Sequence, residues 1–267
     1  MALIYNATFD SQTRVLSLLD KAGNVISSCE VPSKELVDDP NKPLMLRAIE
    51  DNSYVTLKKR GSGTLDNTYQ TSMNGTDWTD YTLGTKISLN KGESVYFRCS
   101  NHPTTQSEQN YVYFIMGGRI EAWHNAYSMI SSDFSSAEGS VGEYGMNGLF
   151  ESCSSLTKAP LLLNALANYC YHSTFFACSY LTKAPSLPAT NLVEGCYYRM
   201  FEGCQSLKEV RISATTTATT TYALLDWLKN VSKTGDFYCD PNAKIFTTGK
   251  SGIPEGWTLR NIADYPN

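Results

Sequence analysis

This chain of 267 residues lacks the segments that would insert a protein into a membrane or export it. No stretch reaches the roughly 18 consecutive apolar residues of a membrane-spanning helix. The N-terminus, MALIYNATFDSQTRVLSLLDKAGNV, has no basic region followed by an apolar core, which is the pattern of a secretory signal peptide. We therefore expect no membrane insertion and no export by the usual route.

Charge of either sign is also scarce. Only 18% of the residues are charged, the formal net charge is -4 and the isoelectric point is near 5.4. A protein that binds a phosphate backbone needs a surplus of lysine and arginine, so we expect no nucleic-acid partner. Tyrosine, serine, threonine, asparagine and glycine are abundant instead, a balance more typical of extracellular or virion β proteins than of cytosolic enzymes.

Catalytic motifs are missing as well. The sequence has no G-x-S-x-G, no Walker loop, no dinucleotide fingerprint and no H-E-x-x-H. Its histidines, His102, His124 and His172, stand far apart in unrelated contexts, so each is expected to be a surface or packed residue. Acidic pairs such as Asp38-Asp39 lie in turn-like segments, where carboxylates are more often solvated than catalytic. We predict no enzyme activity, no catalytic residue and no cofactor.

Metal-binding spacings are absent too. No C-x-x-C occurs, so we expect no zinc site. The oxygen-rich strings DDPN (38–41) and CDPN (239–242) lack the dense alternation of a calcium loop, and Asp-Pro-Asn is better explained as turn chemistry. We therefore predict no metal ligand.

An internal repeat is the strongest positive signal in the chain. The strings LFESCSSLTKAP, FFACSYLTKAPSLPA and MFEGCQSLKEV follow one another from residue 149 to residue 210, with offsets of 25 and then 26 residues. Each unit reads F-x-x-C-x-x-L-x-x-A-P, a spacer, then Cys-Tyr. The corresponding residues are Phe150, Phe175 and Phe201; Cys153, Cys178 and Cys204; Leu156, Leu181 and Leu207; and Cys170-Tyr171 and Cys196-Tyr197.

A period in the mid-twenties is the length of one coil of a leucine-rich solenoid, whose coils bury apolar residues only by stacking on their neighbours. One coil alone has no core, so the repeat needs a cap at each end. A disulfide framework is one interpretation of the eight cysteines. We favour another, in which the cysteines that obey the repeat are free thiols at stacked inward positions, acting as small buried hydrophobes.

Short alternating segments fill the chain upstream of the repeat. Residues 2–31 read as strands around a turn at Gly23, and the polar, proline-containing residues 33–43 read as a linker. From Leu44 to Met116, six alternating segments separated by turn residues predict an antiparallel β-sandwich. The predicted domains are a β-hairpin arm with its linker at 1–43 for attachment or oligomerisation, the sandwich at 44–116, the solenoid at 117–214 and a cap at 215–267.

Both ends of the repeat have candidate caps. Gly145-Met146 stands one period before Cys170-Tyr171, so residues 117–148 are interpreted as a degenerate first coil. Downstream, we predict a short amphipathic helix that covers the last coil. This helix is expected to begin at Thr220 or Thr221 and to carry Leu224, Leu225, Trp227 and Leu228. The predicted fold class is thus mainly β: a β arm, an antiparallel sandwich, and a short solenoid with a helical and β cap.

Several strings resemble the BspA-type leucine-rich repeats of gut Bacteroidetes and their crAss-like phages: MFEGCQSL, LTKAPSLPATNL, EGCYYRMF and TTGKSGIPEGWTL. The similarity extends upstream through residues 75–98 and 117–130, which resemble the β domain that often precedes such repeats. It covers roughly residues 45–262. The spacer at 161–169 departs from the pattern because it lacks the proline found at Pro188, so that coil is expected to be irregular. The family serves adhesion, surface display and virion decoration, so the resemblance specifies fold better than function.

Together, the resemblance and the missing export signal favour a non-enzymatic phage virion protein, a head fibre or capsid decoration assembled in the host cytoplasm. The expected partners are capsid or other virion proteins, further copies of the chain in a dimer or trimer, and a host-surface glycan or protein. The alternative is an adhesin or glycan-binding leucine-rich-repeat protein of the bacterial cell surface.

Two groups of residues are candidate functional sites. Tyr180 and Tyr198 fall out of register in the tyrosine-rich repeats, so we expect them to be exposed and to bind a sugar or a protein surface. An isolated hairpin is marginal in water, so the arm is expected to pair with another domain, subunit or assembly. The candidate attachment residues of the arm are Leu3, Tyr5, Phe9, Val15, Leu16 and Leu18.

Overall fold

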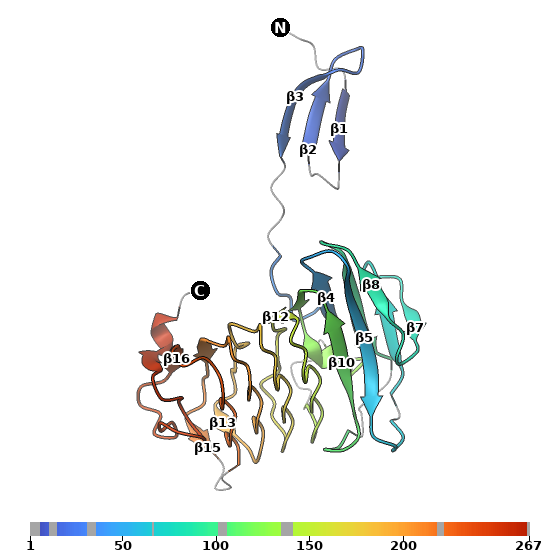
Figure 1. Ribbon diagram of the computed structural model, residues 1–267. Helices are drawn as coiled ribbons and strands as arrows, with labels where there is room; N and C mark the ends of the chain where they lie inside the picture. Colours follow the sequence, from blue (N-terminus) through green and yellow to red (C-terminus); the bar gives the residue numbers. More distant parts are fainter. Residues whose placement is uncertain are drawn as a thin grey trace. The chain divides into compact units, whose positions relative to one another are not determined.

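The computed structural model of the protein describes residues 6–10, 15–30, 36–65, 67–100, 106–134, 141–217 and 222–265. Contacts within the chain divide it into two compact units, Met1–Val37 and Asp38–Asn267, both drawn in Figure 1. The boundary falls inside the segment that the sequence marks as a linker. The predicted division of the second unit into sandwich, solenoid and cap stays a prediction.

The N-terminal unit is a three-stranded antiparallel sheet, and its strands fall on the three segments of residues 2–31 that the sequence reads as strands of the arm. Its strands are β1 (Asn6–Asp10), β2 (Val15–Leu19) and β3 (Val25–Glu30), with β2 in the centre. The turn between β2 and β3 is fixed by the Asp20 carboxylate, which accepts the backbone N–H groups of Ala22 and Asn24, and by Gly23 at a φ of 86°.

The second unit begins with two sheets. One is three-stranded, in the order β10 (Tyr111–Gly117), β5 (Ser53–Arg60) and β8 (Ile87–Leu89). The other is six-stranded, in the order β12 (Leu156–Lys158), β11 (Ile120–Trp123), β4 (Leu44–Ala48), β9 (Ser94–Cys99), β6 (Tyr69–Ser72) and β7 (Thr79–Tyr81). It is mixed, because β11 pairs in parallel with β12 and antiparallel with β4.

Alternation of apolar and polar residues explains how these sheets share a core. Along β9 every second residue is buried, which leaves Val95, Phe97 and Cys99 inside. The ring of Phe97 lies edge-on to the ring of Phe114 on β10, with centroids 5.1 Å apart, so the contact joins the two sheets. All six alternating segments predicted between Leu44 and Met116 are strands; β7, with two of its three residues exposed, was not predicted.

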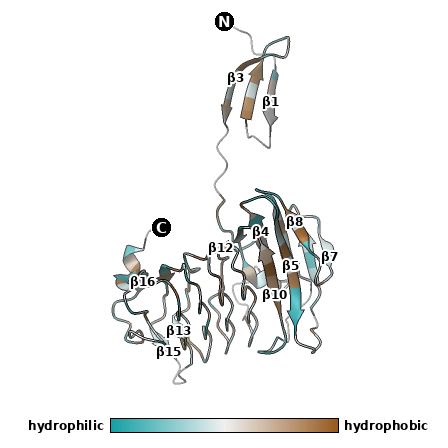
Figure 2. Cartoon of the chain, in the orientation of Figure 1, coloured by the Kyte–Doolittle hydropathy of each residue, from teal (hydrophilic) through white to brown (hydrophobic). Residues whose placement is uncertain are grey.

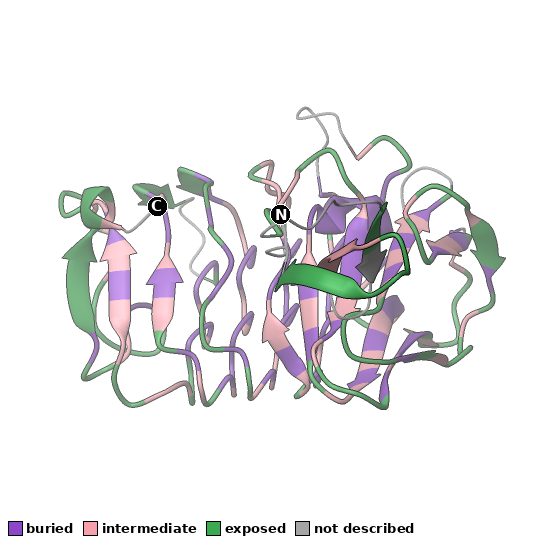
Figure 3. Cartoon of the chain, turned by 90° about the horizontal axis from the view of Figure 1, so that it is seen from above, coloured by how far each residue is buried: buried purple, intermediate pink, exposed green. Residues whose placement is uncertain are grey.

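Beyond these sheets, stretches of chain one repeat period apart lie side by side (Figure 1). Backbone N–H groups of one stretch donate to carbonyls of the next: Phe150 to Thr174 (2.8 Å), Phe175 to Met200 (2.9 Å) and Phe201 to Trp227 (2.8 Å). The rings at the repeated phenylalanine position stack, with 5.4 Å between Phe150 and Phe175 and 5.5 Å between Phe175 and Phe201. These phenylalanines are fully buried. Figure 3 shows that buried residues, in purple, recur from stretch to stretch.

The repeated cysteines are buried, as the register predicts, and those that follow the repeated phenylalanines each donate a hydrogen bond. The thiols of Cys153, Cys178 and Cys204 lie 3.2, 3.1 and 3.0 Å from the carbonyl oxygens of Phe114, Phe150 and Phe175. Burial raises the pKa of these thiols, that of Cys204 to about 12, so they stay protonated and able to donate. All eight cysteines are free thiols, and Cys29 alone is exposed.

The predicted amphipathic helix that carries Leu224, Leu225 and Leu228 is wrong, because residues 222–230 form consecutive turns. The carbonyls of Ala223, Leu225, Trp227 and Lys229 accept N–H groups from the stretch one period earlier. They are therefore not available for the i to i−4 bonds of an α-helix. Trp227 takes the place of the repeated phenylalanine and is fully buried. The predicted capping residues, Thr220 and Thr221, lie outside the described residues.

A parallel sheet and short pairings complete the unit. The sheet has the order β14 (Glu209–Arg211), β16 (Asp236–Cys239) and β17 (Thr258–Asn261), and β13 (Asn191–Leu192) pairs with β15 (Thr216–Thr217). Within the described ranges, the helices are two short 3-10 segments, η1 (Ala126–Met129) and η2 (Ile262–Asp264). Neither has the length to cross a membrane.

Candidate functional site

The described candidate attachment residues lie on a sheet that buries no described side chain. Leu3 and Tyr5 lie outside the described residues, and Phe9 lies on β1 with its side chain not described. Val15, Leu16 and Leu18 lie on β2, where every side chain is only partly exposed. Figure 2 shows apolar colour on both β2 and β3. On β3, Val25 and Ile26 are 60% and 39% exposed, so the sheet presents apolar surface without a core of its own.

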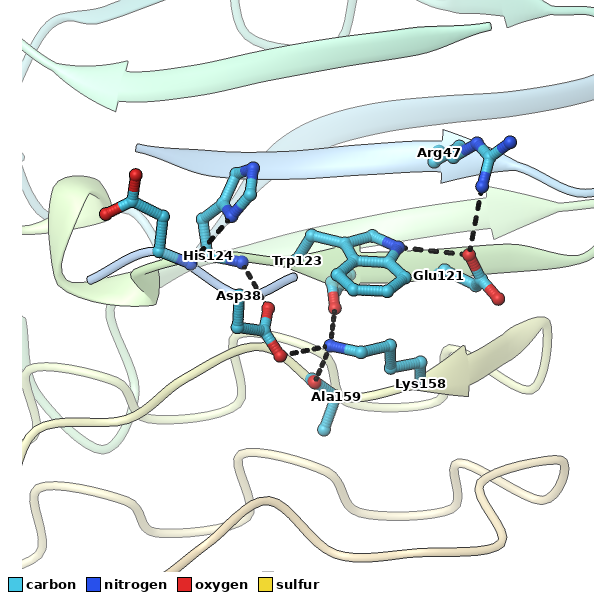
Figure 4. Close-up of polar contacts among 9 residues, drawn as sticks. Asp38, Arg47, Glu121, Trp123, His124, Lys158 and Ala159 are labelled. Carbon is cyan, nitrogen blue, oxygen red and sulfur yellow. Dashed lines mark hydrogen bonds and ion pairs between the residues drawn. The ribbon is translucent and has the colours of Figure 1, made fainter. Parts of the chain in front are cut away.

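The start of the second unit is fixed by a polar network (Figure 4). The Asp38 carboxylate accepts the backbone N–H of His124 at 2.8 Å and the Lys158 ammonium at 2.7 Å. Lys158 also donates to the carbonyls of Ala122 and Ala159, and its Nζ lies 4.0 Å from the centre of the Trp123 ring. Residues at the end of the predicted linker are therefore held against β11 and β12.

His124 is part of this network and is almost fully buried. Its Nδ1 accepts the backbone N–H of Asp39 at 3.1 Å, which requires an unprotonated Nδ1. Burial lowers the pKa of His124 from its ordinary value, against the attraction of Asp38 and Asp39. The imidazole thus acts as a neutral acceptor that anchors the chain.

A groove of about 510 Å³ lies between residues 157–161 and residues 182–186. In the described part of the chain no backbone hydrogen bond joins these two stretches. The two lysines of the groove are already paired, Lys158 with Asp38 and Lys183 with Glu209 at 2.9 Å. The groove therefore offers little free charge to a ligand.

Tyr180 is 48% exposed, as predicted. The Arg119 guanidinium lies 4.5 Å from the centre of its ring and also 3.6 Å from Glu50. Tyr198 is only partly exposed, and the interpretation that it falls out of register is wrong. It occupies the repeat position of Asn147 and His172, and its ring stacks on His172 with centroids 5.0 Å apart.

A polar pocket of about 180 Å³ surrounds His172. Its lining includes pairs of residues one repeat period apart, which lie side by side on neighbouring stretches: Asn147 and His172, Ser173 and Arg199, and Glu151 and Phe176. The lining residues are Asn147, Glu151, His172, Ser173, Phe176 and Arg199 from the repeats, and Arg60, Glu108 and Tyr111 from the strand ends and loop beside them. Gly148 allows this approach, since a Cβ there would lie 2.4 Å from the Tyr111 ring.

The charges of the pocket are balanced. Arg60 lies 3.2 Å from Glu151 Oε1, and the Tyr111 hydroxyl donates to Glu151 Oε2 at 2.6 Å. Arg199 Nε donates to Glu202 at 2.5 Å. Burial raises the pKa of Tyr111, and the neighbouring Glu151 carboxylate raises it further, so the hydroxyl remains a donor.

Hydrogen bonding fixes the tautomer of His172. The Asn147 side-chain amide donates to the carbonyls of Ser107 and Glu108, at 3.0 and 3.2 Å, so its oxygen can only accept. His172 Nδ1 lies 2.9 Å from that oxygen and must carry the proton. The pKa of His172 is lowered by burial, so the neutral ring is favoured and Nε2 is a hydrogen-bond acceptor.

Within the described ranges, no group of three or more histidine, cysteine or acidic side chains could hold a metal ion. The two Asp-Pro-Asn strings are turns, as predicted, with Asp39 and Asp240 each accepting the N–H of the asparagine two residues later. The pocket could not be predicted from a local motif, because Arg60 and Glu151 are 91 positions apart in the sequence. The shared repeat position of Asn147, His172 and Tyr198 was the one sequence feature that pointed to this part of the surface.

Comparison with protein-family models, with curated proteins and with solved structures found no match for this chain.

Proposed function

We propose that the protein is a non-enzymatic structural protein of a phage virion, a head fibre or capsid decoration, whose N-terminal unit attaches it to the particle. The observation that carries the proposal is the N-terminal sheet. It forms a compact unit of its own, yet none of its described side chains is buried. Such a thin sheet is marginal in water unless another surface covers it, and a capsid protein is the expected surface.

The finer fold is part of the proposal. The stacked stretches are coils of a short BspA-type leucine-rich-repeat solenoid, preceded by a β-sandwich. Support comes from the hydrogen bonds between equivalent positions and from the stacked phenylalanines. Residues 231–265 cover the last coil as its cap. In support of this, the Trp227 indole donates to the Gly252 carbonyl at 2.9 Å and its ring packs against Phe237.

Further copies of the chain are the other expected partners. The sheet edges β1 and β3 carry backbone groups that a neighbouring strand can pair, so we propose that the N-terminal units associate in a homo-oligomer, a dimer or trimer. Light scattering measures the molar mass in solution of the full chain and of a chain that lacks residues 1–32. We expect the mass of a dimer or trimer for the full chain and that of a monomer for the shortened chain. A monomeric full chain would contradict the association.

Particle incorporation tests the main proposal. Mass spectrometry of purified phage particles should find peptides of this chain at a fixed ratio to capsid protein. Deletion of residues 1–32 should abolish incorporation while the second unit keeps its melting temperature. A chain with Tyr180→Ala is the matched control, because that side chain is exposed in the second unit. Full incorporation of the deleted chain would overturn attachment through the N-terminal unit.

The second candidate function is that of a bacterial cell-surface adhesin or glycan-binding protein. The specific observation in its favour is the balanced polar pocket around His172, beside the predicted binding residue Tyr198. Location distinguishes the two candidates: an adhesin is recovered with the bacterial envelope and a virion component with particles.

A further inference from the structure

We propose that the pocket around His172 binds a single ring of a neutral sugar, such as the terminal residue of a glycan. The inference deepens the second candidate function, and it is independent of whether the protein belongs to a virion. A head fibre and a surface adhesin could both use such a site.

The size of the pocket limits its ligand. Its volume is about 180 Å³, smaller than the roughly 300–1,000 Å³ of pockets that enclose drug-sized molecules. One sugar ring is a ligand of the matching size. An extended peptide or a whole oligosaccharide would have to leave most of its atoms outside.

The charge of the pocket selects against ionic ligands. The cations Arg60 and Arg199 face the carboxylates of Glu151 and Glu202, and Glu108 adds a further negative charge to the lining. A phosphate or carboxylate ligand would have to displace a paired carboxylate, and a cationic ligand would have to displace an arginine. A neutral ligand disturbs neither pair.

The remaining hydrogen-bonding capacity fits hydroxyl groups. His172 Nε2 can accept, and each guanidinium keeps N–H groups beyond the one contact that joins it to a carboxylate. Glu151 oxygens and the Ser173 hydroxyl add further positions. A sugar hydroxyl both donates and accepts hydrogen bonds. Neighbouring hydroxyls of one ring can therefore donate to His172 Nε2 and Glu151 and accept from the guanidinium groups. Phe176 also lines the pocket, and the Arg199 guanidinium lies 4.9 Å from the centre of its ring, so this wall presents a cation over an aromatic face.

The key acceptor is held in place before a ligand arrives. Asn147 fixes one edge of the His172 ring, and Tyr198 stacks on it at an interplanar angle of 19°. Tyr144 and Tyr169 meet it edge-on, at centroid distances of 6.3 and 6.4 Å. A side chain that is already ordered loses little entropy on binding, so even a small ligand gains from the contact.

Saturation-transfer NMR of the full chain tests the proposal. The neutral probes, at millimolar concentration, are galactose, glucose, mannose, fucose and N-acetylglucosamine. Sialic acid is the charged comparison. We expect saturation of at least one neutral sugar. Arg60→Ala should weaken that binding roughly tenfold by removing a donor, and Arg60 is exposed enough for the fold to survive. Lys58→Ala is the matched control, an exposed cation on the same strand outside the pocket.

A second readout follows the histidine itself. The imidazole nitrogen spectrum should show a protonated Nδ1 on His172 and a shift of its Nε2 when the sugar is added; His172→Phe identifies the signals and should abolish binding. Acidification should also release the sugar, because a protonated Nε2 no longer accepts a hydrogen bond. The charged groups that act on the pKa of His172 are Glu108 and Glu151, which raise it, and Arg199, which lowers it. Saturation of no neutral sugar, equal binding by Arg60→Ala and Lys58→Ala, or preference for sialic acid would each overturn the proposal.

Discussion

The N-terminal sheet and the stacked repeats are both held by backbone pairing between neighbouring stretches, yet only the repeats have a core. In the sheet, Leu16 and Leu18 alternate with Val15 and Leu19, so apolar residues face both sides of a single layer and all stay partly exposed. In the repeats, the residues at each phenylalanine position are fully buried. Backbone pairing alone therefore does not bury side chains; stacking of equivalent positions does.

This contrast predicts how stability is distributed along the chain. Burial of a phenylalanine against two others contributes several kcal/mol, whereas a half-exposed leucine contributes a fraction of that. The second unit should therefore unfold as a cooperative structure by itself. The N-terminal unit should gain most of its stability from whatever covers it.

The largest expected effect follows from breaking the phenylalanine stack. Phe175→Ala removes the ring between Phe150 and Phe201 and should destabilise the second unit by about 3–5 kcal/mol, because the cavity lies inside stacked stretches that cannot close on it. Chemical denaturation of the full chain measures the change. Tyr180→Ala, on an exposed ring of the same repeats, should change stability by less than about 1 kcal/mol. Equal losses in both variants would contradict the stacked core.

Thiol labelling compares the two units directly. Cys29 is the exposed cysteine of the N-terminal sheet, and the other seven are buried in the second unit. In the native protein a thiol reagent should modify Cys29 first. The remaining cysteines should react at least roughly a hundredfold more slowly, which corresponds to about 2.7 kcal/mol of opening free energy. Mass spectrometry of the modified peptides gives the order, and Cys29→Ser removes the fast phase. Fast modification of Cys178 would show that the repeats open as readily as the sheet.

The repeat register was predictable from sequence because stacked inward positions demand the same residue type in each stretch. Phe150, Phe175 and Phe201 form one stack for that reason. The last stretch escaped prediction, since Trp227 replaces phenylalanine and the spacing of Leu224 and Leu228 also suits a helix. Local spacing cannot reveal that the carbonyls there are already bonded to residues one period earlier.

The pocket was predictable only in part. Asn147, His172 and Tyr198 differ in residue type, so their common repeat position is not obvious. It becomes visible only because each of them directly follows the Cys-Tyr position of its repeat. Arg60 and Tyr111 come from strands outside the repeat, and nothing in their local sequence points to Glu151. Contacts between distant segments of the fold assemble the site, and no short motif records them.

A smaller effect is expected at the start of the second unit. Asp38→Ala removes the acceptor for both the His124 N–H and the Lys158 ammonium, and should destabilise this unit by about 1–2 kcal/mol. Glu50→Ala is the matched control, because the Glu50 and Arg119 side chains are each nearly half exposed and such pairs contribute little. Thermal melting of the two variants measures the difference. A loss as large in Glu50→Ala would show that the Asp38 network does not anchor the chain.

The smallest expected effect is a difference in acid sensitivity between the units. The pKa values of His124 and His172 are lowered by burial, so the folded second unit disfavours their protonation. The stability that each contributes is fully present above the ordinary value of 6.5 and is lost as pH falls below it.

Residues 1–37 contain no histidine. In the N-terminal unit, the hydrogen bonds from Asn24 lower the pKa of Asp20 from 3.8, so its contribution is lost only in more acidic solution. Lowering the pH from about 7.5 to about 5 should therefore reduce the melting temperature of the second unit and leave the amide signals of residues 15–30 unchanged. His124→Gln and His172→Phe should each flatten the pH dependence. If the amide signals of the N-terminal sheet were also lost between about pH 7.5 and about pH 5, the acid sensitivity of the two units would not differ as expected.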